Sequence, residues 1–218
     1  MPFLGRASAV ASQAFCNPVW GTEGRARLDA GEAAETVLAD LVSRDEGQAI
    51  RQAHMMDAHG RFAAHTGADC VDWCGHMIGD GHSVAGNMLA GPDVLSATSE
   101  AFLASAGPFP ARLIAAMRAG EAAGGDKRGR QAAGLVIHRG QAHPWLDLRA
   151  DDHDDPLGEL DRLWDVAQER YTAFRMGMAT AEDFSGMTDR APIDAAIAAE
   201  EARRTAEGRS SRSQATEA

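Results

Sequence analysis

Two short connections between apolar runs limit the fold of this chain more than any other feature. Residues 52–57 and 61–65 are joined by a short loop ending in Gly60, where positive φ is useful. Residues 71–78 and 82–88 repeat the pattern around a Gly-Asp-Gly connection. Because connections this short join neighbouring antiparallel strands, we expect two β-hairpins in succession.

Segments with helical spacing of apolar residues flank these hairpins in pairs. The other expected elements, in chain order, are a strand over residues 8–15, a helix capped by Thr22 that ends near Ala30, helices over 32–43, 92–105 and 111–123, strands over 132–137 and 145–148, and a helix from Pro156 to about Phe174. Paired helices alternating with hairpin strands indicate a layered α+β protein rather than a doubly wound sheet.

The chain of 218 residues is long enough for one sizeable core. We expect residues 1–179 to form a single domain that includes its C-terminal helix. Residues 180–218 are rich in Ala, Glu and Arg and predict a helical extension followed by a polar tail. The tail has too few apolar side chains to offset the entropy of ordering, so we expect it to be disordered.

The net charge and the hydropathy of the chain limit the classes of partner that it can bind. The 32 acidic and 21 basic residues give a formal charge of −11, which repels nucleic acid and anionic membranes. No stretch approaches the roughly 20 apolar residues of a membrane span, and the start lacks a signal-peptide pattern. We expect a cytoplasmic protein without nucleic-acid or membrane partners.

The densest charge near an apolar strand lies in residues 124–131, read Gly-Gly-Asp-Lys-Arg-Gly-Arg-Gln. The glycines predict a helix end, and Asp126, Lys127 and Arg128 follow directly. Two interpretations stay open. A solvated loop needs no partner, whereas Arg forks and free backbone N–H groups also suit a carboxylate- or phosphate-binding turn.

Metal-ligand residue types gather between His65 and His76, with Cys70 and Cys74 between them. The Cys-x3-Cys spacing is not that of a zinc knuckle, and both histidines fall in predicted strands, so we expect buried thiols and no metal. The three cysteines do not indicate a disulfide framework. The acidic run over residues 147–155 precedes a proline and favours helix capping over a cation site. No cofactor is expected.

Five stretches, taken together and in this order, resemble one bacterial family. They are VASQAFCNPVWG from Val10, AHTGADC from Ala64, GNMLAGPDVL from Gly86, GEAAGGDKRGRQAAGLVI from Gly120 and DLRADDHDDPLGEL from Asp147. The family is catalogued as domain of unknown function 1028, and the resemblance runs from about Val10 to about Leu163. Its members are described as similar to the N-terminal-nucleophile hydrolases.

The resemblance implies a four-layer αββα sandwich with two antiparallel sheets between helical layers. It implies hydrolysis of a small amide, such as a γ-glutamyl compound or a short peptide, by the first residue of the mature chain. Asn87 is then expected to donate to the oxyanion, and Asp126 with Arg128 to hold the amine and carboxylate ends of the substrate. His65 and Thr66 are added to the expected ligand-binding set because they lie at a predicted strand end, although a strand-end histidine is more often a satisfied surface group; Lys127 completes the set.

The sequence departs from the superfamily pattern at its start, which reads Met1-Pro2-Phe3. Removal of Met1 exposes a proline, which has no nucleophilic side chain, so no nucleophile is identified. Relatives carry a strand-rich stretch before the part that matches Val10. Either the true start lies upstream, or the sandwich lacks its first strands and the nucleophile with them. The competing hypothesis is a non-catalytic small-molecule-binding or oligomeric scaffold protein. A homodimer is compatible with either hypothesis.

Overall fold

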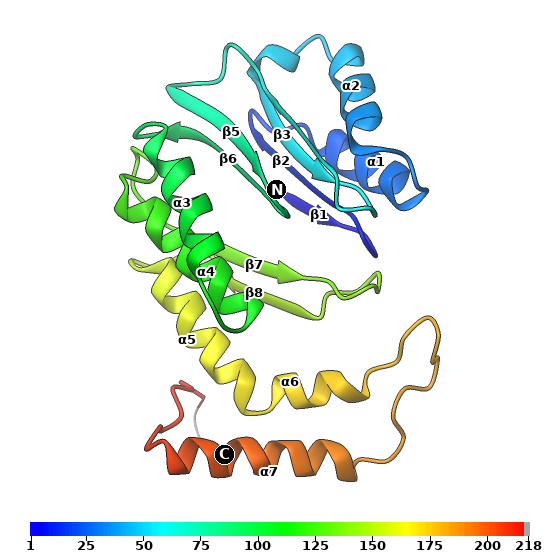
Figure 1. The fold of residues 1–218 in the computed structure, drawn as a ribbon, viewed down its shortest axis with the longest axis vertical. Helices are drawn as coiled ribbons and strands as arrows, with labels where there is room; N and C mark the ends of the chain where they lie inside the picture. The colour runs from blue at the N-terminus through cyan, green and yellow to red at the C-terminus, as the bar shows by residue number, and fades with distance from the viewer. Residues whose placement is uncertain (216–218) are drawn as a thin grey trace. The chain divides into compact units, whose positions relative to one another are not determined.

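The computed structural model describes residues 1–215 and shows a mixed α/β protein with small antiparallel sheets (Figure 1). The chain divides into two compact units. Unit 1 comprises Met1–Arg130 and His138–Pro144, and unit 2 comprises Gln131–Ile137 and the chain from Trp145 onwards. The expected hairpins and the candidate site residues all belong to unit 1.

Unit 1 contains a four-stranded antiparallel sheet in the order β1-β2-β3-β4. Its strands are β1 (Pro2–Leu4), β2 (Ala9–Ala14), β3 (Arg51–Met56) and β4 (Phe62–Thr66). The predicted β3–β4 hairpin is confirmed, and Gly60 in its turn has φ +74°. Strand β1 was not predicted, because three residues are too few to display an alternating pattern.

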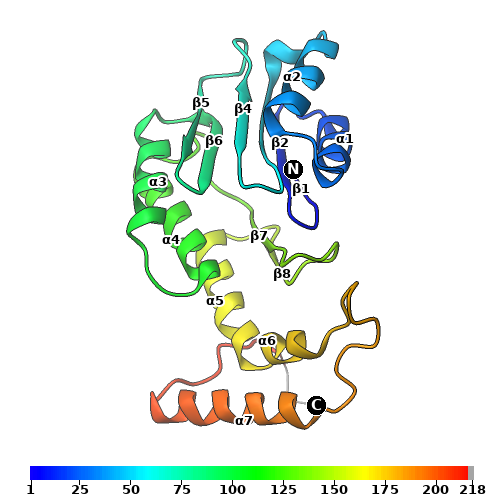
Figure 2. The same cartoon turned by 45° about the vertical axis from the view of Figure 1, so that its right-hand side comes forward.

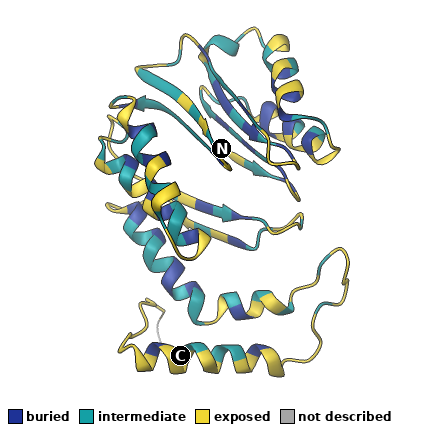
Figure 3. Ribbon diagram, in the orientation of Figure 1, coloured by how far each residue is buried: buried dark blue, intermediate teal, exposed yellow. Residues whose placement is uncertain are grey.

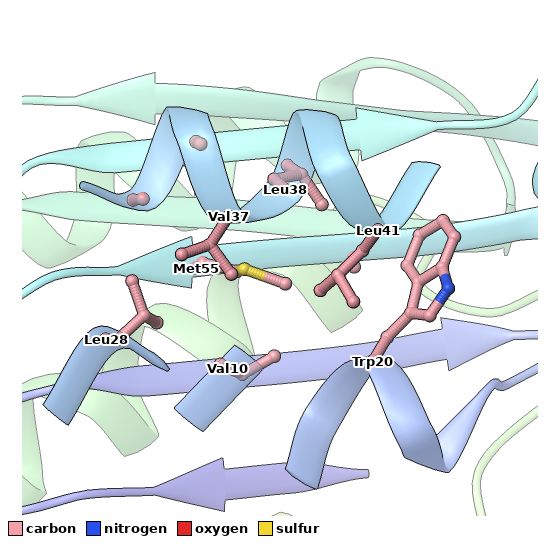
Figure 4. Close-up of a cluster of buried hydrophobic side chains, with 10 residues drawn as sticks. Val10, Trp20, Leu28, Val37, Leu38, Leu41 and Met55 are labelled. Carbon is pink, nitrogen blue, oxygen red and sulfur yellow. The ribbon is translucent and has the colours of Figure 1, made fainter. Parts of the chain in front are cut away.

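One face of this sheet is covered by α1 (Pro18–Asp29) and α2 (Ala34–Arg44). The apolar side chains between the helices and the sheet form the main core of unit 1, and Figure 4 shows several of them converging on Met55. These labelled residues are Val10, Trp20, Leu28, Val37, Leu38, Leu41 and Met55. Burial of this core is the main stabilising contribution to the sheet and its two helices.

The predicted start of the first helix was wrong. Helix α1 begins at Pro18, and the N-cap is Asn17, whose side-chain oxygen accepts from the Val19 N–H at 3.0 Å. Proline suits the first helical position because its φ is already helical and its missing N–H has no partner there. Thr22 lies one turn inside the helix, where its hydroxyl donates back to the Pro18 carbonyl.

The other face of the sheet meets the hairpin of β5 (Trp73–Gly79) and β6 (His82–Leu89). Helix α3 (Asp93–Ala104) packs on the far side of this hairpin, and α4 (Phe109–Ala122) packs beside α3 (Figure 2). The second predicted hairpin and both predicted helices are therefore confirmed. The hairpin is hydrogen-bonded as its own two-stranded sheet rather than as a continuation of β4.

The two faces of β3 differ in chemistry, and the strand lies in the buried middle of unit 1 on both faces, with Gln52 and Ala53 both buried (Figure 3). Ala53 and Met55 point into the core under the helices. Gln52 and His54 lie on the opposite face and form hydrogen bonds to the hairpin. Around Gln52 and His54, the sheet and the hairpin are consequently joined by polar groups.

Unit 2 is built on a two-stranded antiparallel sheet with helices beside it. Its elements are β7 (Ala133–Ile137), β8 (Leu146–Ala150), α5 (Pro156–Glu169), α6 (Tyr171–Phe174) and α7 (Ala191–Ala206). A short 3-10 turn, Arg175–Gly177, follows α6. Unit 1 has a similar turn, Gln48–Ile50, immediately before β3. Helix α5 packs on both strands, and α7 contacts α5 and α6. Part of the predicted polar tail, residues 216–218, lies outside the described residues.

The single long helix predicted from Pro156 to Phe174 was wrong. The chain breaks at Arg170, whose φ of −144° and ψ of −41° are not helical, and α6 is a separate short helix. Helix α7 is fixed to α5 by the buried Arg204, which donates to Asp165 at 2.8 Å and to Glu169 at 3.1 Å. This bidentate pair gives the end of α7 a defined contact on α5.

Asp57, in the β3–β4 turn, serves as a remote cap for α2. Its carboxylate accepts from the N–H groups of Ala34, His59 and Arg61 and from the Arg61 guanidinium at 2.8 Å. Burial raises the pKa of Asp57, but these backbone donors and Arg61 outweigh it and lower the pKa to about 2.

Because the folded pKa is below the unfolded value of about 4, stability from this carboxylate is present above pH 4 and lost as the pH falls towards 2. We expect Asp57→Asn to lower the free energy of unfolding at pH 7 by about 1–2 kcal/mol and to flatten its decline below pH 4. Urea unfolding across this pH range measures both effects, with Glu46→Gln as an exposed control. Parallel acid profiles for Asp57→Asn and the unsubstituted protein would contradict this assignment.

Candidate functional site

A row of polar side chains crosses the four-stranded sheet at one end of unit 1. Gln13 pairs with Gln52 in the β2–β3 register, and Gln52 pairs with Thr66 in the β3–β4 register. Residues directly opposite one another on neighbouring strands share a face, and this face meets the β5–β6 hairpin. The row therefore places two amides and a hydroxyl beside one another at the ends of three strands.

The Gln52 amide joins the sheet to the hairpin. Its Nε2 group lies 2.9 Å from each of three acceptors, which are the Thr66 hydroxyl and the carbonyls of Gly75 and Gly86. An amide NH2 group has two protons, so these acceptors share them. Gly75 lies next to an irregularity in the β5–β6 pairing. At this irregularity the Gln52 side chain donates to the strand carbonyls.

The oxygen of the fully buried Gln52 side chain is also bonded. It accepts from Gln13 Nε2 at 2.7 Å and from Asn87 Nδ2 at 3.3 Å. Asn87 is near the end of β6 and was predicted to donate to an oxyanion. One N–H of its NH2 group donates to Gln52. The other N–H is a hydrogen-bond donor of the type that stabilises an oxyanion.

Thr66 and His76 form a hydroxyl–imidazole pair at the edge of this polar layer. The distance from Thr66 Oγ1 to His76 Nδ1 is 2.8 Å, and the pair is exposed to solvent. Because the Thr66 oxygen already accepts from Gln52, its own proton is free to be donated to His76. Partial desolvation and the positive charge of His65 lower the pKa of the exposed His76, so the ring is neutral at pH 7 and accepts this proton.

His65 and Thr66, predicted as a ligand-binding pair, lie on opposite faces of β4. His65 Nε2 is 2.9 Å from the Gln48 carbonyl, and the ring packs edge-on against Trp20 of the helix-covered core. Successive side chains of a strand point in opposite directions, which accounts for the separation. Thr66 alone belongs to the polar row.

The turn over residues 124–131 is attached to the end of β6. The Lys127 N–H donates to the Met88 carbonyl at 2.9 Å, and the Ala90 N–H donates to the Gly125 carbonyl at 3.0 Å. Gly124 and Gly125 both have positive φ, which confirms the predicted helix end. The turn and Asn87, which are far apart in the sequence, are thereby brought together.

The charged side chains of this turn bind mainly to their own neighbours. The Arg128 guanidinium donates to Asp126 at 3.0 and 2.6 Å and holds the pKa of that carboxyl below its usual range. Lys127 Nζ lies 3.8 Å from Asp72 in the β4–β5 connection. That Asp126 and Arg128 hold the two ends of a ligand stays a prediction, and such a ligand has to compete with their mutual pairing.

Non-glycine residues with positive φ mark the same end of the unit. Ala14 has φ +60° and follows Gln13, and Met88 has φ +56° and follows Asn87. Asp72, the partner of Lys127, has φ +57°. Such conformations cost about 1–3 kcal/mol each and cluster at functional sites, so their positions beside the site amides favour a functional role for this end.

A second hydroxyl–imidazole pair lies further along the polar layer. His54 Nδ1 is 2.8 Å from Ser83 Oγ. Burial, followed by the positive charges of His76 and the N-terminus, lowers the pKa of His54 to about 4. Within residues 1–215, no group of three or more metal-ligating side chains is close enough to hold a metal ion. No helix of this part of the chain is both long and apolar enough to cross a membrane.

The fold and site define a mixed α/β protein with a polar layer between an antiparallel sheet and a β-hairpin. The sequence matches the family described as "Family of unknown function (DUF1028)" over residues 2–160. The chain therefore belongs to this family, as the five motifs indicated.

A solved structure supports the same fold. The crystal structure of a protein from Silicibacter pomeroyi, assigned to family DUF1028, matches with a TM-score of 0.76 and 34% sequence identity. The match covers 84% of this chain and 80% of that chain. A comparison with curated proteins found no match.

The site predicted from the sequence did not include Gln52, which is central in the structure, or His76, the imidazole partner of Thr66. Gln52 is a polar residue inside a run read only as a strand, and its neighbour Ala53 faces the opposite side. His76 was considered only as a metal ligand. A signal for Gln52 existed in the strand alternation, which places Gln52 and His54 on the face of β3 opposite Ala53. No local pattern pointed to His76, because its contact with Thr66 depends on how β4 and β5 meet.

Replacement of Gln52 by Leu is expected to destabilise the protein. The change leaves the carbonyls of Gly75 and Gly86 and the amides of Gln13 and Asn87 without this partner. Unsatisfied buried groups cost about 1–3 kcal/mol each, so the free energy of unfolding should fall by at least about 3 kcal/mol. Guanidinium unfolding measures this, with the exposed Gln131→Leu as a control; equal losses in the two variants would contradict the assignment.

Stability should also fall as the pH is lowered from about 6.5 to 4. The folded pKa of His54, about 4, is below its unfolded value of about 6.5, so the unfolded chain binds more protons in this interval. We expect a loss of about 2 kcal/mol between these pH values, and His54→Gln should remove most of it. Thermal unfolding at fixed pH values tests this against the exposed control His59→Gln, which should retain the decline.

Proposed function

We propose that this protein hydrolyses small amides or short peptides at the polar end of unit 1. The observation that carries the proposal is the solvent-exposed Thr66–His76 pair, at 2.8 Å. A hydroxyl bonded to a neutral imidazole is the arrangement in which a weak nucleophile gains a general base. The neighbouring amide of Asn87 supplies a donor for the developing oxyanion.

The fold offers independent support. Helices α1 and α2, the four-stranded sheet, the β5–β6 hairpin and α3 with α4 contact one another in that order. This order is the one expected for the αββα sandwich of N-terminal-nucleophile hydrolases, and we propose that unit 1 is a variant of that fold. A likeness of fold does not define chemistry, so the function is argued from the site.

In the proposed reaction, Thr66 Oγ1 attacks the amide carbonyl of the substrate while His76 Nδ1 takes the hydroxyl proton. The carbonyl oxygen gains negative charge and accepts a hydrogen bond from Asn87. His76 then delivers its proton to the leaving nitrogen as the C–N bond breaks, and an acyl-Thr66 ester remains. Water hydrolyses this ester, again with His76 as the base, and restores the Thr66 hydroxyl.

The ligand-binding residues proposed around this pair are those of the adjoining turn. Lys127 lies beside the end of β6 through its backbone bond to Met88, and its ammonium group is half-exposed. This cation suits a substrate carboxylate, such as that of a γ-glutamyl amide or a short peptide. Asp126 and Arg128 would take the amine and carboxylate ends only after exchanging their mutual hydrogen bonds for bonds to the ligand.

The test is turnover of a panel of γ-glutamyl and short-peptide p-nitroanilides. Thr66→Ala is expected to lower kcat/KM by at least about 1,000-fold, because it removes the attacking atom. His76→Asn should cause a loss of similar size, whereas Thr66→Ser keeps the hydroxyl and should keep measurable activity. Ser83→Ala, in the second hydroxyl–imidazole pair, is the matched control and should change kcat/KM by less than about threefold.

Turnover by Thr66→Ala at the unsubstituted rate would exclude Thr66 as the nucleophile. The rival function is a non-catalytic small-molecule-binding or scaffold protein, and the internal pairing of the Gln13, Gln52 and Asn87 amides favours it, because these groups already satisfy one another. Binding of the amides by calorimetry, without turnover of any of them, would support the rival. We propose the hydrolase because the Thr66–His76 pair, unlike these amides, is exposed.

A further inference from the structure

Two cysteine thiols lie in and beside the connection between β4 and β5. Cys74 Sγ is 3.8 Å from the carbonyl oxygen of Cys70, and Cys70 Sγ is 3.4 Å from the carbonyl oxygen of Arg51. Both side chains are half-buried and both are free thiols. The pair has no role in the proposed hydrolysis, yet Thr66 precedes Cys70 by one short loop and His76 follows Cys74 in the same strand.

The backbone holds these thiols in a defined loop. The Gly67 N–H donates to the Arg51 carbonyl and the Asp69 N–H to the Ala49 carbonyl, each at 2.8 Å. A Cβ atom on Gly67 would lie 2.2 Å from the Ala49 oxygen, so the start of the loop is tightly fitted. Asp72, between the two cysteines, has φ +57° and lies in a bend of the chain. The loop conformation therefore brings the Cys74 thiol to the backbone of Cys70.

The two side chains are neighbours, because Cys74 Sγ reaches the backbone carbonyl of Cys70. Burial raises the pKa of Cys70, and the charge of Cys74 raises it further. Cys70 is consequently protonated at neutral pH and does not react first.

We infer that Cys70 and Cys74 form a modification site, a dithiol that oxidises reversibly to a disulfide and clamps the loop carrying Thr66 and His76. The disulfide closes the short segment that contains Asp72, the partner of Lys127. Formation of an S–S bond draws the two sulfur atoms to about 2 Å from each other, which shifts the start of β5. The reduced and oxidised forms thus differ in the relative placement of Thr66 and His76.

The oxidant is a low-molecular-weight disulfide such as oxidised glutathione. The Cys74 thiolate attacks one glutathione sulfur, which breaks the glutathione disulfide and releases one glutathione thiolate. Cys70, deprotonated as it reacts, then attacks Cys74 sulfur in the mixed disulfide and releases the second glutathione. Two protein thiols are oxidised, one glutathione disulfide is reduced, and the two thiol protons go to the two glutathione molecules.

The experiment exposes the full chain to oxidised glutathione, then to dithiothreitol, and counts free thiols and intact mass. The reduced protein has three thiols, from Cys16, Cys70 and Cys74. Oxidation should consume two of them, lower the mass by about 2 Da without adding glutathione, and be reversed by dithiothreitol. Cys16→Ser is the matched control and should lose two thiols as well, whereas Cys70→Ser and Cys74→Ser should form no internal disulfide.

A second measurement reads the site directly. The imidazole resonances of His76, followed by NMR, should move on oxidation in Cys16→Ser and stay in place in Cys74→Ser. Failure of Cys16→Ser to lose two thiols, an internal disulfide in Cys70→Ser, or an unmoved His76 signal after oxidation would each overturn the inference. Neither measurement uses a substrate. The clamp matters for catalysis only if the proposed hydrolysis is correct, so a failed activity assay is distinguishable from a failed disulfide.

Discussion

The hydrogen bonds of one buried amide, Gln52, connect the principal parts of unit 1. Its NH2 group reaches the hairpin carbonyls and Thr66, and its oxygen receives Gln13 and Asn87. Because an unpaired amide in this interior is costly, sheet and hairpin must keep their separation and alignment for all of these bonds to form. The position of Thr66, and with it that of His76, is a consequence of this requirement.

The two faces of the sheet have different roles, because one stabilises the fold and the other carries the proposed chemistry. The helix-covered face contains the apolar core around Met55, which supplies hydrophobic stabilisation. The hairpin-covered face has amides, hydroxyls and histidines, and the strained residues Ala14 and Met88 adjoin its amides. A stable core on one side permits polar and strained groups on the other, which is the usual relation between scaffold and site.

Local patterns predicted most of the elements, because turn glycines, strand alternation and helix periodicity act over a few residues. The hairpins around Gly60 and Gly81 and the helix end at Gly124 follow from such signals. The prediction failed where a distant partner or a neighbouring residue decided the outcome, as at Asn17, which took the cap assigned to Thr22. The site was found only in part, because the contact of Thr66 with His76 depends on how β4 and β5 meet, which no local pattern specifies.

The carboxylate of Asp57 links two segments that the chain makes at different times. Helix α2 ends at Arg44, yet the acceptor for the N–H at its first residue, Ala34, lies 23 positions further along the chain. During synthesis on the ribosome, α2 therefore emerges before its cap exists and lacks a contribution of about 1 kcal/mol. Closure of the β3–β4 turn supplies it, so the helix and the hairpin become mutually dependent during folding.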